Sequence, residues 1–240
     1  MTTTTDPIAV EQPLPATTPL STLLREGTRP EHEAAEQMGF VEALMAGRLD
    51  RAAYTDLAVQ QHAIYTALEA ASAQIRTQPG GEAIVFDELT RIPSIEADLA
   101  FLLGPDWAQQ MRVLPAAERY AARLRETGTS LPAYAAHAYT RYLGDLSGGQ
   151  IIQRMLQRHY GFGEEGVSFY HFADIPKPKP FKDAYRERLD ALELDEDARA
   201  AAVTEAKQAF EYNRALFAEL GELHLREPGA RSDGSPGVHM

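Results

Sequence analysis

Residues 136–150 read AHAYTRYLGDLSGGQ, and this stretch carries the strongest structural signal in the chain. The residues on both sides of it have helical spacing, yet Gly144, Gly148 and Gly149 crowd into one short segment. Each glycine inside a helix costs about 1 kcal/mol relative to alanine, so three of them together need a reason. Glycine lets a helix bend and lets another group approach the main chain closely. The stretch therefore predicts a helix that is kinked against a close neighbour.

Two kinds of neighbour fit these glycines. A second helix could cross closely at small residues, but that arrangement gives the carboxylate of Asp145, inside the break, no role. A ligand could instead approach the backbone, with Asp145 as a hydrogen-bonding anchor. A phosphate-binding loop is disfavoured, because the patterns GxxxxGK[ST] and GxGxxG are both absent. From the residues alone, a ligand site and a tight helix crossing both remain open.

Helical periodicity extends outward along most of the chain. Between Asp50 and Thr77 apolar residues recur three and four apart, with Asp50 as the expected N-cap and Pro79-Gly80-Gly81 as the stop. Strand-like alternation is scarce. Further helices are expected from Pro132 toward Gly161 and at about 94–103, 115–126, 181–193 and 196–221, with Pro176–Pro180 among the separators.

These patterns predict an all-α, single-domain, multi-helix bundle over residues 21–226. The Thr/Pro-rich residues 1–20 and the Gly/Pro-rich residues 227–240 are expected to be disordered tails. At 240 residues, with 44% hydrophobic and 24% charged residues, one domain is the default.

Composition excludes several classes of function. A net charge of -12 argues against nucleic-acid binding, which needs a basic surface. The absence of cysteine excludes disulfides, thiolate metal ligands and cysteine nucleophiles. The N-terminus lacks the basic start and apolar block of a signal peptide, and no apolar run approaches the ~18 residues of a membrane helix. A soluble, cytoplasmic, monomeric protein without a membrane partner is expected.

Among seven histidines, His32 stands out because Glu36 lies one helical turn further on. Both side chains then project from one face of a helix. A histidine that ligates a metal usually donates its second ring N–H to a carboxylate or similar acceptor. Pairs with this spacing are also common on solvated faces, so the spacing leaves both readings open. Because Pro30 would disrupt a helix interior, we expect the helix to restart at Thr28, with Thr28 and Glu31 as a capping box.

The stretch 136–150 resembles the distal helix of the heme oxygenase family, in its soluble, bacterial, biliverdin-producing form. The resemblance continues over most of residues 20–220. It includes the segments 64–69, 98–101, 104–107, 181–186 and 205–207, together with Phe210 and Asn213. It implies a helical bundle that binds heme between a proximal helix and a kinked distal helix.

The resemblance also implies roles for particular residues. His32 lies in a Thr-x-x-x-His-x-x-x-Glu pattern with Thr28 and Glu36, which is similar to the pattern around the family's axial iron ligand. Gly144 and Gly148 would let the distal backbone approach the iron, so that bound O2 bends toward a meso carbon of the porphyrin. Asp145 would hold waters that deliver protons. More remote members of this network would be Arg141, Tyr139 and Tyr65, and other heme contacts would come from Gly149, Phe210 and Asn213.

Basic residues should receive the two heme propionates. Arg25 takes the place where relatives carry lysine, and Lys182 and Arg186 match the family's propionate-binding pair. The implied reaction uses O2 and external electrons to cleave heme, commonly at the α-meso carbon, to biliverdin, CO and ferrous iron. An electron donor such as a ferredoxin or a flavin reductase is implied, and the basic stretch 177–188 could dock an acidic one.

Three other classes of protein fit these features less well. A heme carrier or sensor would keep the axial histidine but tolerate a damaged distal motif, whereas Gly144, Asp145 and Gly148 are intact. A ferritin-like di-metal bundle needs Glu-x-x-His pairs, and no glutamate precedes any histidine by three residues. A thiamin-degrading enzyme of similar fold would need a catalytic cysteine.

Overall fold

Side-chain caps begin the two longest helices of the computed structural model, which describes residues 18–225. Helix α4, Arg51–Ile75, follows Asp50, whose carboxylate accepts a hydrogen bond from the Ala53 amide at 2.9 Å. Helix α11, Glu196–His224, follows Asp195, whose carboxylate accepts one from the Ala198 amide at 2.8 Å. Each cap satisfies an amide that the first helical turn would otherwise leave without a partner. The N-cap predicted at Asp50 is confirmed.

Shorter helices complete the bundle, and no strand occurs within residues 18–225. The α-helices are α1 (Leu20–Gly27), α2 (Arg29–Glu36), α3 (Gly39–Met45), α5 (Ile92–Leu103), α6 (Trp107–Gln110), α7 (Pro115–Thr127), α8 (Leu131–Ala138), α9 (Gly144–Tyr160) and α10 (Pro178–Asp190). The 3-10 turns are η1 (Gly81–Ala83), η2 (Asp87–Leu89) and η4 (Ser168–Tyr170), and η3 (Tyr139–Leu143) is a π-helical turn. The predicted all-α, single-domain class is confirmed.

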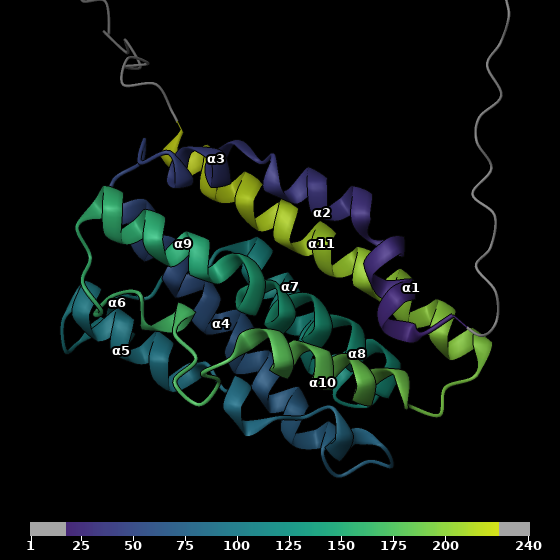
Figure 1. Cartoon of the computed structure of the whole chain (residues 1–240). Coiled ribbons are helices and arrows are strands. Elements are labelled where there is room, and N and C mark those ends of the chain that lie inside the picture. Colours follow the sequence, from purple (N-terminus) through teal and green to yellow (C-terminus); the bar gives the residue numbers. More distant parts are fainter. Residues whose placement is uncertain (1–17, 226–240) are drawn as a thin grey trace, which may run out of the picture.

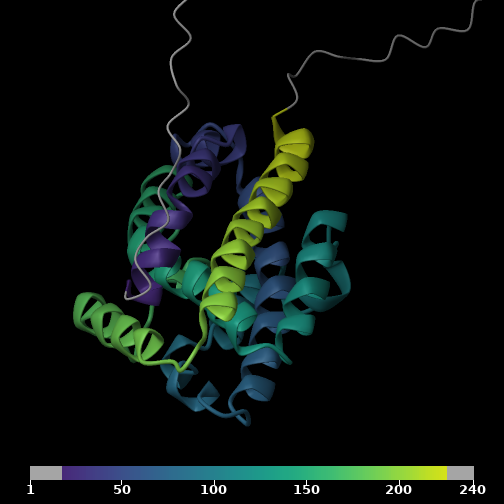
Figure 2. The ribbon, with the colours of Figure 1, turned by 90° about the vertical axis from the view of Figure 1, so that its right-hand side faces the viewer.

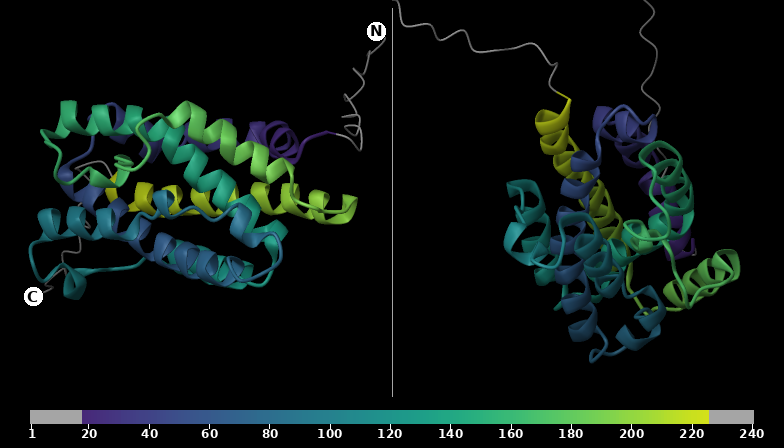
Figure 3. Two further views of the ribbon diagram at one scale, coloured as in Figure 1. Left: turned by 60° about the horizontal axis from the view of Figure 1, so that its bottom comes forward. Right: turned by 90° about the vertical axis from the view of Figure 1, so that its left-hand side faces the viewer.

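Two layers of helices position the site. Helices α1, α2 and α3 follow one another along α11 (Figure 1). On the other side of the core, α4 packs against α5, α7 and α8. Figures 2 and 3 show α10 at the edge of the bundle, where it contacts α1 and α9. No helix within residues 18–225 combines the length and the apolar character needed to cross a membrane.

Three sequence-based boundaries need correction or restriction. The tails expected over 1–20 and 227–240 lie outside the described residues except at 18–20, where Leu20 begins α1 and is buried. The capping box is wrong, because the Thr28 hydroxyl donates to the Leu24 carbonyl at 2.7 Å and caps no amide of α2. The separator expected at 176–180 is partly wrong, because α10 begins at Pro178. Proline is tolerated there since the first helical turn has no amide bonds to lose.

Candidate functional site

A cleft of about 900 Å³ lies between the proximal helix α2 and the segment formed by η3 and α9. Its volume is near the upper end of the ~300–1,000 Å³ range of small-molecule and cofactor sites. The lining residues come from α1, α2, η3, α9, α10 and α11. They are Arg25, Glu26, Thr28, Arg29, His32, Glu33, Glu36, Tyr139, Thr140, Leu143, Gly144, Ser147, Gly148, Ile151, Arg186 and Phe210.

His32 forms the proximal wall of the cleft. Its side chain is 55% exposed, and its Nδ1 atom lies 3.6 Å from Glu36 Oε2. Phe210 of α11 packs edge-on against the imidazole, with ring centroids 5.6 Å apart. Nδ1 thus faces a carboxylate, whereas no hydrogen bond or ion pair within residues 18–225 engages Nε2, which leaves Nε2 for a ligand in the cleft.

The opposite wall is lined by Leu143, Ser147 and Ile151, and at Gly144 and Gly148 it is backbone without side chains. A Cβ built at Gly144 or Gly148 meets nothing within 4 Å. The two glycines are four residues apart on α9, and therefore share the face that lines the cleft. The adjacent face of α9 turns inward, where a Cβ at Gly149 would come within 3.1 Å of the Tyr170 ring. A flat ligand between α2 and α9 would thus meet an imidazole on one side and bare backbone on the other.

The irregularity in the distal segment lies just before the glycines. Tyr139–Leu143 forms a π-helical turn, while Gly144–Tyr160 is regular α-helix. The predicted break is therefore displaced toward the N-terminus of its expected position. An extra residue in one turn changes which side chains face inward, and such turns often occur at functional sites. Tyr139 and Thr140 line the cleft here, while Arg141 and Tyr142 are buried.

A polar network lies behind the glycine wall. The Tyr65 hydroxyl of α4 donates to Asp145 Oδ2. The Arg141 guanidinium lies over the Tyr65 ring, 4.8 Å from its centroid. Its Nη1 donates to Asn213 Oδ1 of α11 at 2.8 Å, and its Nη2 donates to Gln61 Oε1 of α4.

Burial sets the protonation of this network. Desolvation raises the pKa of Asp145, and Arg141 and the Tyr65 hydrogen bond partly oppose that rise. Desolvation also raises the pKa of Tyr65 well above its ordinary value, so Tyr65 stays a neutral donor. Asp145 is consequently a carboxyl that takes up a proton more readily than an exposed aspartate.

Two arginines line the cleft on the side of α1 and α10. Arg25 belongs to α1 and Arg186 to α10, and both lower the pKa of the buried Tyr139 hydroxyl, which burial otherwise raises. Lys182 lies one turn before Arg186, and its Nζ donates to the Ser147 hydroxyl of α9 at 2.9 Å. Arg25 is paired with Glu26 and Arg186 with Asp183, and an anionic group in the cleft would compete with these acids for the two guanidinium groups.

Comparison with known proteins identifies this architecture. The family model described as heme oxygenase matches residues 18–219. The chain belongs to the heme oxygenase family. Heme oxygenase 1 of Synechocystis sp. is 38% identical over 202 residues, which cover 84% of each chain. Human heme oxygenase 1 is 38% identical over 238 residues, which cover 96% of this chain and 83% of the human one.

Solved structures of the family give the same fold. The crystal structure of heme oxygenase-1 from Synechocystis in complex with heme superposes with a TM-score of 0.82 at 37% identity, covering 86% of this chain and 94% of that chain. The heme oxygenase of Leptospira interrogans gives a TM-score of 0.80 at 34% identity, covering 84% of this chain and all of that one. Membership makes this chain a heme-degrading oxidoreductase.

The site residues expected from the heme oxygenase resemblance divide into two groups. Eight of them line the cleft: Arg25, His32, Glu36, Tyr139, Gly144, Gly148, Arg186 and Phe210. The others do not line it: Tyr65, Arg141, Asp145, Gly149 and Asn213 lie behind its walls, and Lys182 lies beside it on the Ser147 hydroxyl. Asn213 holds Arg141 rather than lining the cleft, and Gln61 was not anticipated at all. The sequence signal for Gln61 was its position four residues before Tyr65, which places both side chains on the same face of a helix.

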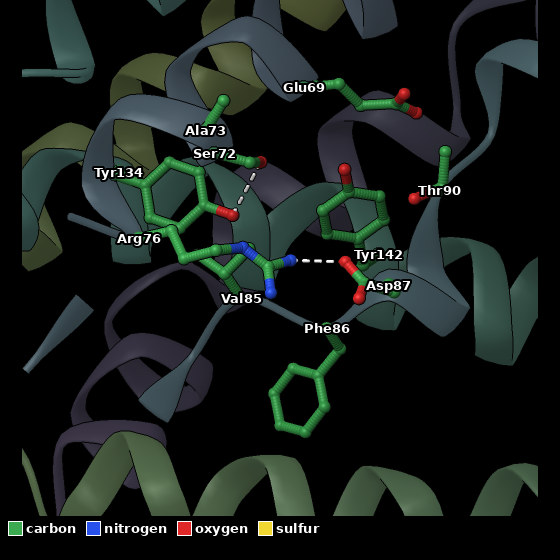
Figure 4. Close-up of a pocket in the computed structure, with 10 residues that line it drawn as sticks. All are labelled: Glu69, Ser72, Ala73, Arg76, Val85, Phe86, Asp87, Thr90, Tyr134 and Tyr142. Carbon is green, nitrogen blue, oxygen red and sulfur yellow. Dashed lines mark hydrogen bonds and ion pairs between the residues drawn. The ribbon is translucent and has the colours of Figure 1, made fainter. Parts of the chain in front are cut away.

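A second cavity lies behind the distal segment (Figure 4). It measures about 430 Å³ and is lined by side chains of α4, η2, α8 and η3, among them Glu69, Tyr134 and Tyr142. The Ser72 and Tyr134 hydroxyls hydrogen-bond at 2.8 Å, and Arg76 pairs with Asp87. Glu69 accepts hydrogen bonds from the amides of Arg91 and Ile92, at the start of α5, at 2.6 and 3.1 Å. His32 and the glycine wall lie outside this cavity.

Proposed function

We propose that heme binds between α2 and α9 with its iron on His32 Nε2, and that O2 and external electrons cleave it to biliverdin, CO and ferrous iron. The observation that carries the proposal is an imidazole on one side of the cleft and the exposed backbone of Gly144 and Gly148 on the other. A histidine provides an axial ligand for heme iron. The glycine wall leaves a confined space for O2 on the face of the heme opposite His32.

Orientation of the substrate follows from the charges. Arg25 and Arg186 attract the two propionates to their side of the cleft. The propionates flank one meso carbon, and the α-meso carbon lies on the opposite edge of the porphyrin. Holding the propionates at Arg25 and Arg186 therefore directs the α edge toward the other end of the cleft. This supports cleavage at the α-meso carbon.

The iron of the substrate supplies the activation of O2, and the chain supplies protons and shape. Asp145 does not line the cleft, so it acts through water on the distal side. Tyr65 and Arg141 fix the position and the charge of its carboxyl. Electrons come from an external donor, for which we propose a ferredoxin or a flavin reductase that approaches the basic side chains of α10.

The decisive experiment adds hemin to the purified protein in air and follows the visible spectrum, with ascorbate in one sample and ferredoxin plus its reductase in another. We expect a sharp Soret band that decays as a biliverdin band grows, and chromatography should identify the α isomer. A Soret band that persists under both reductants would contradict the proposed chemistry. A different isomer would overturn only the proposed orientation.

Gly148→Leu tests the glycine wall. The added side chain has open space around its Cβ, so the variant should fold and melt at or above the wild-type temperature, since leucine is the better helix former. Because the side chain enters the space meant for substrate and O2, turnover should fall about 100-fold, as for a reacting geometry displaced by about 1 Å. Gly163→Leu is the matched control, since its Cβ also meets nothing and lies away from the cleft. Equal turnover in both variants would remove the glycine wall from the proposal.

Arg186→Ala tests the propionate end. Losing one charge-assisted hydrogen bond should weaken hemin binding about tenfold and let the porphyrin bind in mixed orientations, which gives mixed biliverdin isomers. Lys179→Ala removes the same charge from the same helix, and the Lys179 side chain is 89% exposed and outside the cleft. Titration with hemin and chromatography of the products compare the two variants. An equal loss in both would mean that only the net charge of α10 matters.

A further inference from the structure

The buried guanidinium of Arg141 depends on two neutral oxygens. Arg141 is 8% exposed. Its Nη1 and Nη2 donate to Asn213 and Gln61, while its Nε is buried without a partner among the described residues. A buried cation needs hydrogen bonds, because each unsatisfied donor incurs the full cost of desolvation. Gln61 therefore provides one of the few contacts that can fix the orientation of this charge.

Gln61 also lies in register with Tyr65. The two residues are four apart on α4, so they project from the same face of the helix. One turn of α4 thus delivers an acceptor to Arg141 and a donor to Asp145. The guanidinium between them rests on the Tyr65 ring. Without Gln61, the Asp145 carboxylate is a negative charge whose Coulombic attraction reaches Arg141.

We infer that Gln61 is a positioning residue of the distal site: by holding the Arg141 guanidinium over Tyr65, it keeps Arg141 from pairing directly with Asp145 and leaves that carboxyl to Tyr65 and to water. The expected effect of Gln61 on kcat rests on the proposed function. Its expected effect on the position of Arg141 does not. Direct pairing with Arg141 would withdraw Asp145 from the proton delivery that ring opening needs.

The neighbouring glutamine has a different role and supplies a control. Gln60 is 1% exposed, donates to the Arg112 carbonyl at 3.0 Å and accepts from the Leu114 amide at 2.8 Å. It ties α4 to the segment before α7 and has no contact with Arg141. Gln60→Leu should therefore destabilise the fold while leaving the distal network as it is.

The structural test uses the protein without heme. In ¹⁵N spectra of the wild type, the Arg141 Nη–H groups should give resolved, slowly exchanging signals, assigned by their absence in Arg141→Lys. Gln61→Leu and the shorter Gln61→Asn should lose them, because the acceptor is removed or withdrawn. Gln61→Glu should retain these signals, since glutamate has the same side-chain length and still provides an acceptor oxygen. Gln60→Leu should also retain them.

The kinetic test uses the heme complex. Gln61→Asn should lower kcat about tenfold, the order expected for one hydrogen bond to a charged group, with hemin affinity unchanged. Gln61→Glu should keep at least about half of the wild-type rate, since the contact to Arg141 is retained. The inference is overturned if Gln61→Asn keeps the Arg141 signals or the wild-type kcat, or if Gln60→Leu lowers kcat equally. A wild type that binds heme without degrading it would instead contradict the proposed function, and the spectra without heme would still decide the role of Gln61.

Discussion

Replacing His32 with alanine is expected to remove the His-ligated Soret band and to lower heme turnover by ~100-fold or more. His32 is the only imidazole among the described residues that line the cleft, so no other nitrogen ligand can take its place. Loss of a partner in the outer shell of a metal site already costs ~10–100-fold, and loss of the ligand itself should cost at least as much. Spectra of the hemin complex and single-turnover rates measure both effects.

Two further measurements assign the loss to ligation. His171→Ala removes an exposed imidazole outside the cleft and should keep the wild-type spectrum and rate. Free imidazole added to His32→Ala should restore the Soret band in part, because the deletion leaves space of that shape beside Phe210. If His32→Ala kept the wild-type spectrum, the iron would have to be held on the other face of the cleft.

Helix positions followed well from the sequence because caps and breakers act locally. Asp50 caps α4 in the structure as its position before an apolar periodic run predicts. Thr28 shows the limit of such reasoning. A threonine hydroxyl can hydrogen-bond to the helix before it as well as to the helix after it. Here it donates to the Leu24 carbonyl, in the last turn of α1. Sequence spacing alone does not distinguish the two choices.

The site followed from the sequence only where residues lie close together in the chain. The glycines and Asp145 form one local pattern, and its resemblance to a known family predicted a ligand cleft. Gly144 and Gly148 line this cleft, and Asp145 lies behind its wall. Gln61 and Asn213 meet Arg141 across 80 and 72 residues of sequence. Such contacts depend on how α4 and α11 pack against η3, and helical periodicity marks both residues only as positions on a half-buried face. The π-helical turn also could not be predicted from the sequence, because it depends on the packing around the segment and not on the composition of the segment.

Asp145→Asn is expected to separate heme binding from chemistry. Asp145 lies behind the glycine wall, so hemin affinity and the Soret band should stay close to those of the wild type. Turnover should fall ~100-fold, the lower end of the contribution of a positioned acid–base group, because an amide cannot take up and release a proton. The amide oxygen can still accept from the Tyr65 hydroxyl, so the fold and its melting temperature should change little.

The pH dependence of turnover tests whether the Asp145 carboxyl itself titrates. Burial raises its pKa, while Arg141, the Tyr65 hydrogen bond and Arg91 lower it in part. Tyr65→Phe removes one of the lowering influences, so the pKa of Asp145 should rise and the corresponding inflection in rate should move to higher pH. In Asp145→Asn the same inflection should disappear. An inflection that stays in place in both variants would belong to another group, and Asp145 would then act through its shape and hydrogen bonding rather than through its proton.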